Sequence, residues 1–204
     1  MRCLTALFIV FTLFSTQLVA QESIELELTP LFGYRFGGEF DDEQSNSTIE
    51  LEDGNSYGLL TSWAYDQSRQ GELLVSHYDS AFSSELTNNV FNPSDIGITY
   101  IHLGGNIQLS DNNLPFYLSG GIGITHLSPE NNGLKSETKF SGSLGLNTRV
   151  ALTESVRLYI GGRVYATLLD ADSEIFCDSQ NCAIYVESEV WVQSELSAGL
   201  TFKF

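Results

Sequence analysis

The chain has 204 residues and a mass of 22.5 kDa, which suits one all-β domain or at most two small domains. Hydrophobic residues make up 42% of it, which excludes a disordered protein, while charged residues make up only 17%, below the roughly 25% of an ordinary soluble domain. Nine basic residues against 26 acidic ones give a net charge of −17, which repels phosphate backbones, so no nucleic acid partner is expected.

The first 20 residues have the features of a secretory signal peptide. A positive charge at Arg2 precedes an apolar stretch, 4–14, and the run LVA at 18–20 resembles the site that a signal peptidase cleaves. A transmembrane anchor is the rival interpretation, but it needs about 20 apolar residues. We therefore predict a signal peptide at 1–20 and one exported domain at 21–204.

Alternation of apolar and polar residues predicts β-strands after this leader. In 24–40 the even positions are mostly apolar and the odd positions mostly polar or small, and 156–168 and 190–204 repeat the pattern. In the run ELLVSHY, apolar residues occupy both even and odd positions, so the sequence does not show which side of this strand is apolar. In 96–109 the apolar residues move from even to odd positions midway, which predicts a β-bulge. The five segments that alternate less cleanly are 56–66, 71–80, 95–110, 113–127 and 137–152.

The connections between these eight segments alternate in length. Short polar turns alternate with four long polar loops, which are 41–55, 80–94, 128–136 and 169–188. In an up-and-down sheet every second connection lies at the same end, so one end has tight turns and the other has long loops. This asymmetry is typical of outer-membrane barrels. We predict an all-β fold, an eight-stranded antiparallel up-and-down transmembrane β-barrel with both termini in the periplasm.

The polar side of the predicted strands indicates which side faces lipid. A water-exposed exterior would carry many Lys and Glu residues, but this side consists mainly of Gly, Ser, Thr, Asn and Tyr with scattered charges. Small side chains suit the interior of eight strands, which is only wide enough for side chains to fill it. The apolar side is therefore predicted to face lipid. A soluble barrel that carries a ligand is the alternative.

Charged residues on the inward side are predicted to form a paired network that plugs the lumen, because buried charges need partners. Near the periplasmic end, the residues expected to meet are Glu25, Glu27, Lys203, Arg157 and Arg149. Higher in the lumen, the residues expected to meet are Arg35, Arg163, Glu195 and Glu39. A gated polar conduit is the alternative role for this network.

Two cysteines follow the leader, Cys177 and Cys182 in the run FCDSQNC. An even pair in an exported chain usually forms a disulfide, because compartments outside the inner membrane are oxidising. Metal ligation by two thiolates is the alternative, but the run contains no histidine. We predict a disulfide, and neither a metal nor a cofactor.

Most acidic residues fall in the long loops and at their edges, where solvation of an exposed surface explains them. Such clusters also suit divalent cations that bridge the loops to lipopolysaccharide phosphates. Outer-membrane lipid and lipopolysaccharide are therefore the expected partners, and a monomer is expected.

The C-terminal run GLTFKF resembles the C-terminal signature of bacterial outer-membrane proteins, with Phe204 at the terminus and Phe202 two residues before it. This resemblance implies that the barrel-insertion machinery reads the segment. The runs GYRFGGEFDD (33–42) and YLSGGIGITHL (117–127) are similar to the small eight-stranded group that includes the OmpA transmembrane domain, OmpX and OmpW. The resemblance implies an architecture and an outer-membrane location, but no activity.

One group of residues resembles a catalytic site. His126, Ser128 and Glu137 resemble the His-x-Ser plus Glu site of lipid A deacylases, in which a serine activated by histidine attacks an acyl ester. By parity His126 and Ser128 face outward, whereas Glu137 faces inward. We therefore expect no enzyme and predict a barrel with a structural or surface-interaction role. A narrow porin-like channel and the deacylase are the alternatives.

Overall fold

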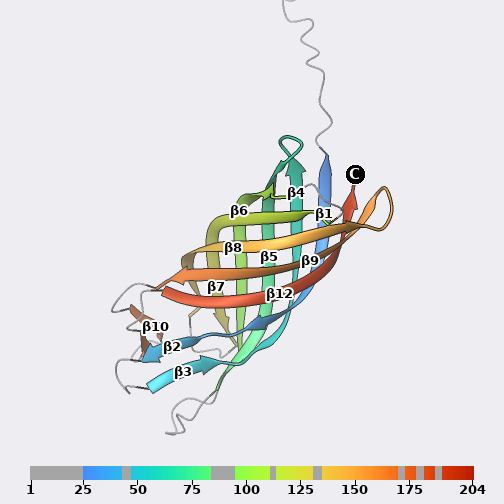
Figure 1. Ribbon diagram of the computed structural model, residues 1–204. Helices are drawn as coiled ribbons and strands as arrows, with labels where there is room; N and C mark the ends of the chain where they lie inside the picture. The colour runs from blue at the N-terminus through green and yellow to red at the C-terminus, as the bar shows by residue number, and fades with distance from the viewer. Residues whose placement is uncertain are drawn as a thin grey trace, which may run out of the picture.

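Eight long strands form a barrel in the computed structural model (Figure 1). The structure describes residues 25–42, 47–83, 95–110, 114–130, 135–169, 173–177, 182–186 and 190–204, and the predicted signal peptide lies outside them. In this part of the chain, no helix is long and apolar enough to cross a bilayer. The barrel strands are β1 (Leu26–Phe36), β4 (Gly54–Ala64), β5 (Arg69–Ser83), β6 (Asp95–Gln108), β7 (Phe116–Pro129), β8 (Glu137–Ala151), β9 (Val156–Leu168) and β12 (Val190–Lys203).

The barrel is closed because each long strand pairs with a neighbour on both sides. The ring runs β1, β4, β5, β6, β7, β8, β9, β12 and back to β1, and every pair in it is antiparallel. The strands follow one another around the ring in chain order. This confirms the predicted eight-stranded up-and-down barrel.

The pairing register sets the tilt of the strands. Register partners followed once around the ring from Leu26 lead back to β1 at Phe36, which is ten residues further along the strand. The partners on this path are Trp63, Gly71, Gly105, Gly120, Leu144, Val164 and Ser194. At a rise of about 3.3 Å per residue and a strand spacing of about 4.8 Å, this stagger corresponds to a tilt of roughly 40°.

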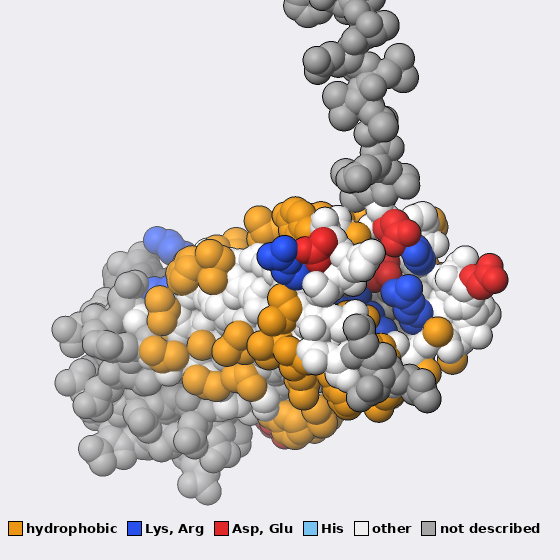
Figure 2. All heavy atoms as spheres, turned by 45° about the horizontal axis from the view of Figure 1, so that its top comes forward, with side chains coloured by type: hydrophobic (Ala, Val, Ile, Leu, Met, Phe, Trp, Pro, Cys, Tyr) orange, Lys and Arg blue, Asp and Glu red, His pale blue; other side chains and the backbone are white. Residues whose placement is uncertain are grey.

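Side chains alternate between the lumen and the outer wall along each barrel strand. In β1, Glu27, Thr29 and Arg35 are at most 3% exposed, whereas Phe32 is 65% exposed. Hydrophobic side chains cover much of the flank in Figure 2, and charged side chains gather at the short-turn end. The apolar side of the strands is therefore the outer wall, as the sequence predicts.

The phase change predicted within 96–109 does not occur. β6 pairs with both β5 and β7 residue by residue and skips none, so it contains no bulge. Ile96, Ile98 and Tyr100 all face the lumen, as does His102 further along the strand. The inward side of β6 changes from apolar to polar, while the direction of its side chains stays constant. In the sequence, apolar residues that face the lumen look as if the apolar side of the strand had switched, although it has not.

Two of the predicted long loops contain strands, which corrects the assignment of these segments. β2 (Glu39–Asp42) and β3 (Ser47–Leu51) form one hairpin, and β10 (Ser173–Cys177) and β11 (Cys182–Val186) form another. β3 pairs with the end of β5, and β11 pairs with β2, so the hairpins extend the wall at the loop end (Figure 1). These strands have only four or five residues each, and β11 (CAIYV) is apolar at every position, so alternation does not reveal them.

The predicted strand 24–40 is interrupted at Gly38. Its φ of 79° lies in the left-handed region, which glycine adopts without steric cost. A Cβ atom there would lie 2.5 Å from the carbonyl oxygen of Val192. The chain therefore turns at Gly38 from β1 into β2.

The turn between β4 and β5 is held by Asp66. Its Oδ1 accepts hydrogen bonds from the backbone N–H groups of Ser68 and Arg69, at 2.9 and 2.8 Å. Its Oδ2 accepts a hydrogen bond from Arg69 Nε at 2.7 Å. The Ser68 N–H and then the Arg69 guanidinium stabilise the carboxylate and lower the pKa of Asp66 to about 2.

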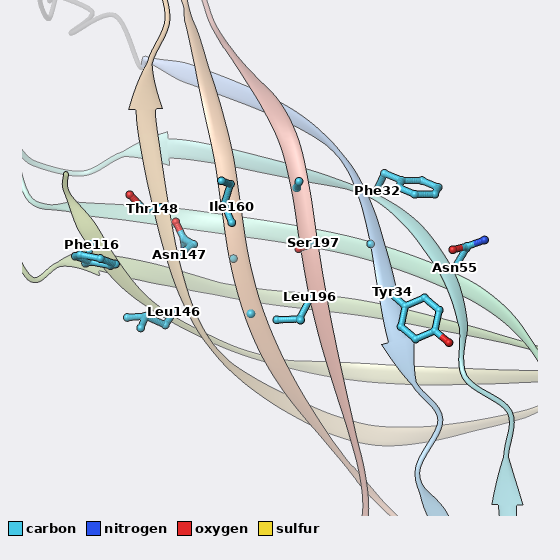
Figure 3. A pocket seen from close by; sticks show the side chains of 14 residues that line it. Phe32, Tyr34, Asn55, Phe116, Leu146, Asn147, Thr148, Ile160, Leu196 and Ser197 are labelled. Atoms are coloured by element: carbon cyan, nitrogen blue, oxygen red, sulfur yellow. The ribbon is translucent and has the colours of Figure 1, made fainter.

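A shallow apolar hollow lies on the outer wall over β8, β9, β12 and β1 (Figure 3). Phe32 and Tyr34 lie at one side of it and Phe116 at the other. Gly162, which has no side chain, and Ala198, which has only a methyl group, line it as well and leave the wall low between the larger side chains. Such a surface suits the acyl chains of a surrounding lipid.

The two cysteines of the predicted disulfide lie opposite each other in the β10–β11 hairpin. Cys177 and Cys182 are register partners across the β10–β11 hairpin, and directly opposite Cα atoms lie about 4.5–5.5 Å apart, within the range of disulfides. We expect iodoacetamide to alkylate neither cysteine in the oxidised protein, and both after reduction. In the Cys177→Ser control, Cys182 should react without reduction. Alkylation of both cysteines in the untreated protein contradicts the disulfide.

Candidate functional site in the lumen

The lumen is the candidate functional site, because the barrel strands direct most of their charged side chains into it. Its cationic side chains are Arg35, Lys139, Arg149, Arg157, Arg163 and Lys203. The carboxylates that pair with them are Glu25, Glu27, Glu72, Glu137 and Glu195. Six of the nine basic residues of the chain thus lie in the lumen or at its mouth.

Glu27 and Glu72 hold together a network near the short-turn end. Glu27 accepts hydrogen bonds from Arg149 at 2.8 Å and from Arg157 at 2.7 Å. Glu72 accepts one from Arg149 at 3.0 Å and lies 3.6 Å from Arg163. Apart from the side chain of Arg157, which is 30% exposed, these groups are buried. Their charge-assisted hydrogen bonds offset the cost of removing the charges from water.

An exposed ion pair lies at the mouth of the lumen. Lys203 Nζ lies 2.8 Å from Glu25 Oε2, and the two side chains are 31% and 54% exposed. The structure therefore brings the five residues predicted near the periplasmic end into two groups. Glu27 collects Arg149 and Arg157, while Glu25 pairs with Lys203.

A second network surrounds Arg35 higher in the lumen. Arg35 forms an ion pair with Glu195, donates a hydrogen bond to Ser76 Oγ, and is completely buried. Two of its nitrogens, Nε and Nη1, have no hydrogen-bond partner among the described residues. Aromatic ring faces take the place of such partners through cation–π contact. The rings, with centroids 4.5 to 5.0 Å from Arg35 Cζ, belong to Tyr165, Tyr100 and Tyr78. Arg35, Glu195 and these three tyrosines are called the Arg35 cage.

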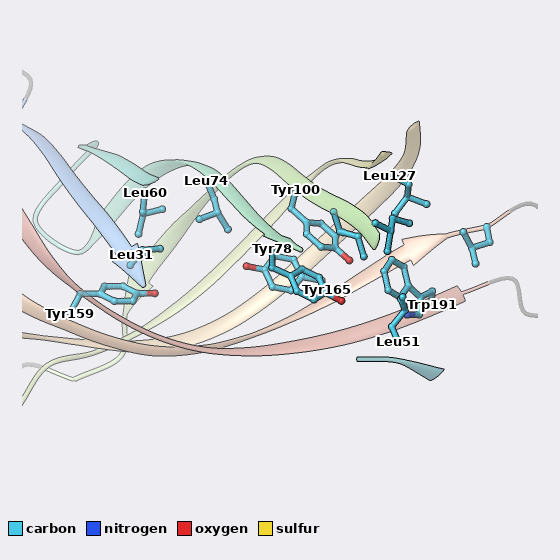
Figure 4. Close-up of a cluster of buried hydrophobic side chains, with 13 residues drawn as sticks. Leu31, Leu51, Leu60, Leu74, Tyr78, Tyr100, Leu127, Tyr159, Tyr165 and Trp191 are labelled. Atoms are coloured by element: carbon cyan, nitrogen blue, oxygen red, sulfur yellow. The ribbon is translucent and has the colours of Figure 1, made fainter. Parts of the chain in front are cut away.

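The lumen is closed on the loop side of the Arg35 cage. Gln193 donates hydrogen bonds to the Tyr78 hydroxyl and the Gly37 carbonyl, and it accepts one from the Tyr100 hydroxyl. Beyond Gln193 lies an apolar cap of side chains that are at most 5% exposed, with Leu51, Leu127 and Trp191 at one end of Figure 4. The members of this apolar cap are Leu51, Ile96, Ile98, Leu127, Leu169 and Trp191.

His102 joins the two networks. Its Nδ1 lies 2.9 Å from Ser143 Oγ and its Nε2 lies 2.8 Å from Ser141 Oγ. Arg163 donates a hydrogen bond to the same Ser143 hydroxyl, at 3.2 Å. The His102 ring also lies 5.5 Å from the Tyr100 ring, between centroids. Side chains therefore fill the lumen continuously from Arg163 to the Arg35 cage.

The sequence does not identify Glu72 as part of the network. In ELLVSHY both sides of β5 carry apolar residues, so the alternation there has no visible phase. The sequence predicts that Arg35 and Arg163 meet Glu195 and Glu39. In the structure Glu195 pairs with Arg35 and is the register partner of Arg163, whose ion pair is with Glu72. The side chain of Glu39 lies outside the described residues.

The residues of the deacylase alternative lie on two sides of the barrel wall. His126 is a register partner of Thr138, and its Nδ1 lies 2.9 Å from the Thr138 hydroxyl on the outer wall. Ser128 is exposed two residues further along the same side. Glu137 follows the lumen phase of β8, and its carboxylate lies 3.5 Å from Lys139 Nζ. The hydroxyl, imidazole and carboxylate thus do not converge from one side of the wall.

The described residues offer no arrangement for a metal ion. Nowhere among them do three or more His, Cys, Asp or Glu side chains gather in a way that would hold one. The lumen carboxylates instead face arginine and lysine side chains. The arrangement suits mutual neutralisation of charge.

Comparison with known proteins supports the architecture. No protein-family model matches the chain, and no curated protein matches it. Solved structures that match include Neisserial surface protein A, which is 14% identical with a TM-score of 0.59 over 88% of this chain and 97% of that one. AlkL in lipid bilayers is 13% identical with a TM-score of 0.58 over 89% and 90% of the two chains. OprG from Pseudomonas aeruginosa is 11% identical with a TM-score of 0.53 over 89% and 96%.

These likenesses show that the chain has the fold of small outer-membrane β-barrels, as its resemblance to the OmpA, OmpX and OmpW group implies. At identities this low they establish the fold alone. The function must be argued from the residues of the site.

We expect the Arg35 cage to contribute measurably to stability. We expect Glu195→Gln to lower the free energy of unfolding by about 3–5 kcal/mol, because it leaves the Arg35 charge buried without its partner. Arg35→Met combined with Glu195→Gln should cost less than the sum of the single changes. Glu25→Gln, which breaks the exposed pair with Lys203, is the matched control and should cost about 0–1 kcal/mol. Denaturant unfolding in detergent micelles measures all five proteins, which are the wild type, the three single variants and the double variant. Equal losses for Glu195→Gln and Glu25→Gln contradict the prediction.

Proposed function

We propose that this chain is an integral outer-membrane barrel that holds its loops at the bacterial surface and conducts little or no solute. The observation that carries the proposal is the filled lumen. The Arg35 cage and the apolar cap lie in series along the barrel axis, and the side chains of both are at most 5% exposed. A solute would have to displace both layers to pass.

The outer wall supports a position within a lipid bilayer. Large apolar side chains on it remain exposed, including Phe32 at 65%, Leu144 at 67% and Leu196 at 62%. A continuous apolar surface of this kind is costly in water and favourable in hydrocarbon. On this proposal the leader at 1–20 directs export, and the C-terminal strand with Phe202 and Phe204 is the segment that the barrel-insertion machinery reads.

The loop end is the proposed contact surface. There the β2–β3 and β10–β11 hairpins extend the barrel wall (Figure 1). The sequence around them is rich in aspartate and glutamate, which suits divalent cations that bridge to lipopolysaccharide phosphates. Lipid and lipopolysaccharide are therefore the proposed partners, and the proposed form is a monomer. A lipid A deacylase is not proposed, because Glu137 lies on the lumen side, away from His126 and Ser128.

Planar-bilayer recording tests this function. We expect the wild-type protein to show no steady openings at neutral pH, because its lumen is sealed. A variant that combines Tyr100→Ala and Tyr165→Ala in the Arg35 cage with Trp191→Ala in the apolar cap should open a measurable conductance, because it removes large side chains from both layers. Phe116→Ala, on the outer wall, is the matched control and should remain closed. Steady, ohmic openings of the wild-type protein would instead support the narrow porin-like channel.

A further inference from the structure

The part of the lumen nearest the short turns contains more positive than negative charge. Three guanidinium groups and two carboxylates, all within one network of contacts, form what we call the basic basin. Its members are Arg149, Arg157, Arg163, Glu27 and Glu72. Their formal charges sum to one positive charge, in a chain whose total charge is −17. The ion pairs at Arg35 and at Lys203, in contrast, each join one cation to one carboxylate among the described residues.

Both carboxylates of the basic basin are already shared. Glu27 accepts hydrogen bonds from Arg149 and Arg157. Glu72 accepts hydrogen bonds from Arg149 and Asn106, and it lies 3.6 Å from Arg163. Among the described residues, one positive charge of the basin therefore has no carboxylate of its own. An uncompensated charge in a narrow, mostly buried space is costly unless something neutralises it.

Buried polar atoms without a partner lie in the same part of the lumen. Both amide atoms of Asn147 lack a hydrogen-bond partner among the described residues, although the side chain is only 2% exposed. Arg149 Nε also lacks one, while the Arg149 guanidinium lies 5.0 Å from the centroid of the Tyr117 ring, and Arg149 is two residues from Asn147 on the lumen side of β8. Asn147 is in register with Tyr117 and Gly161, so it lies between β7 and β9. Unpaired N–H donors and excess positive charge thus coincide.

The basic basin can be reached from one end only. Arg157 is 30% exposed, whereas Arg149 and Arg163 are 1% and 7% exposed. The member nearest the short-turn mouth, Arg157, is therefore the most exposed, and basic side chains are visible at that mouth in Figure 2. Further in, Leu31, Leu60 and Leu74 are buried within the lumen, to the left of the tyrosines of the Arg35 cage in Figure 4.

We propose that the basic basin is a binding site for a small monovalent anion, a halide or a short carboxylate, that enters from the short-turn mouth. Guanidinium and amide N–H groups are the donors that such an anion accepts. The two carboxylates limit the excess charge to one, which favours a monoanion over a phosphate or sulfate dianion. The site goes beyond the proposed function and does not depend on it, because binding at a closed end requires no conduction.

Chloride is the probe, with the full protein purified from bacterial membranes in detergent micelles. Chloride replaces gluconate at constant ionic strength, so that screening does not change, while NMR signals are followed. We expect saturable shifts, with a midpoint in the millimolar range, centred on the Asn147 side-chain amide and the Gly161 amide. The mapping on the wild-type protein tests the site without a variant. Shifts that grow linearly with chloride, or that centre elsewhere, overturn the proposal.

Two variants that each remove one positive charge distinguish binding at the basic basin from a general attraction of chloride to the positive mouth. Arg157→Gln removes the excess charge of the basic basin and leaves Glu27 with Arg149, so we expect chloride affinity to fall by about tenfold or more. Lys203→Gln is the matched control, because Lys203 is 31% exposed at the same mouth but pairs with Glu25. We expect it to retain the wild-type midpoint. Equal losses in the two variants overturn the proposal, since they indicate attraction by the mouth as a whole.

Discussion

The whole structure depends on one constraint: the space inside eight strands is too narrow for charged side chains to keep their water. The outer wall is apolar, so the barrel strands direct most of their charges into that space. Each buried charge then needs an opposite charge, a hydroxyl or an aromatic face within reach. Arg35 obtains all three kinds of partner, from Glu195, Ser76 and the ring of Tyr165.

The same constraint divides the lumen into two parts with different properties. Around Arg35, one cation meets one carboxylate, and tyrosine rings complete the packing, so the layer is neutral and closed. Around Arg149, three cations share two carboxylates near a mouth that water can enter. The closed layer supports a barrel that does not conduct. The open, positively charged part supports a binding site on one side of that layer.

The sequence predicts the fold well, because period-two alternation reports directly on which side of a strand is apolar. It predicts the lumen position of Arg35 and Glu195 for the same reason. It fails where the lumen itself is apolar. Ile96 and Ile98 in the apolar cap lead the sequence to predict a bulge that is not there. Apolar residues on both sides of β5 leave the sequence without a sign that Glu72 faces the lumen. Alternation carries no information about which strands face each other across the lumen, so the partner of Arg163 requires the structure.

The most direct test of the account asks which side of the wall faces lipid, and the two tryptophans of the chain are natural probes for it. Trp63 packs against Tyr65 and over Gly71 near the short-turn end of the outer wall, whereas Trp191 is 1% exposed in the apolar cap. In vesicles of brominated phospholipid, the fluorescence of a Trp191→Phe protein, which retains Trp63, should be strongly quenched. That of a Trp63→Phe protein should be nearly unchanged. Quenching of Trp191 with protection of Trp63 would mean that the wall is inverted and that the charges are not sealed inside it.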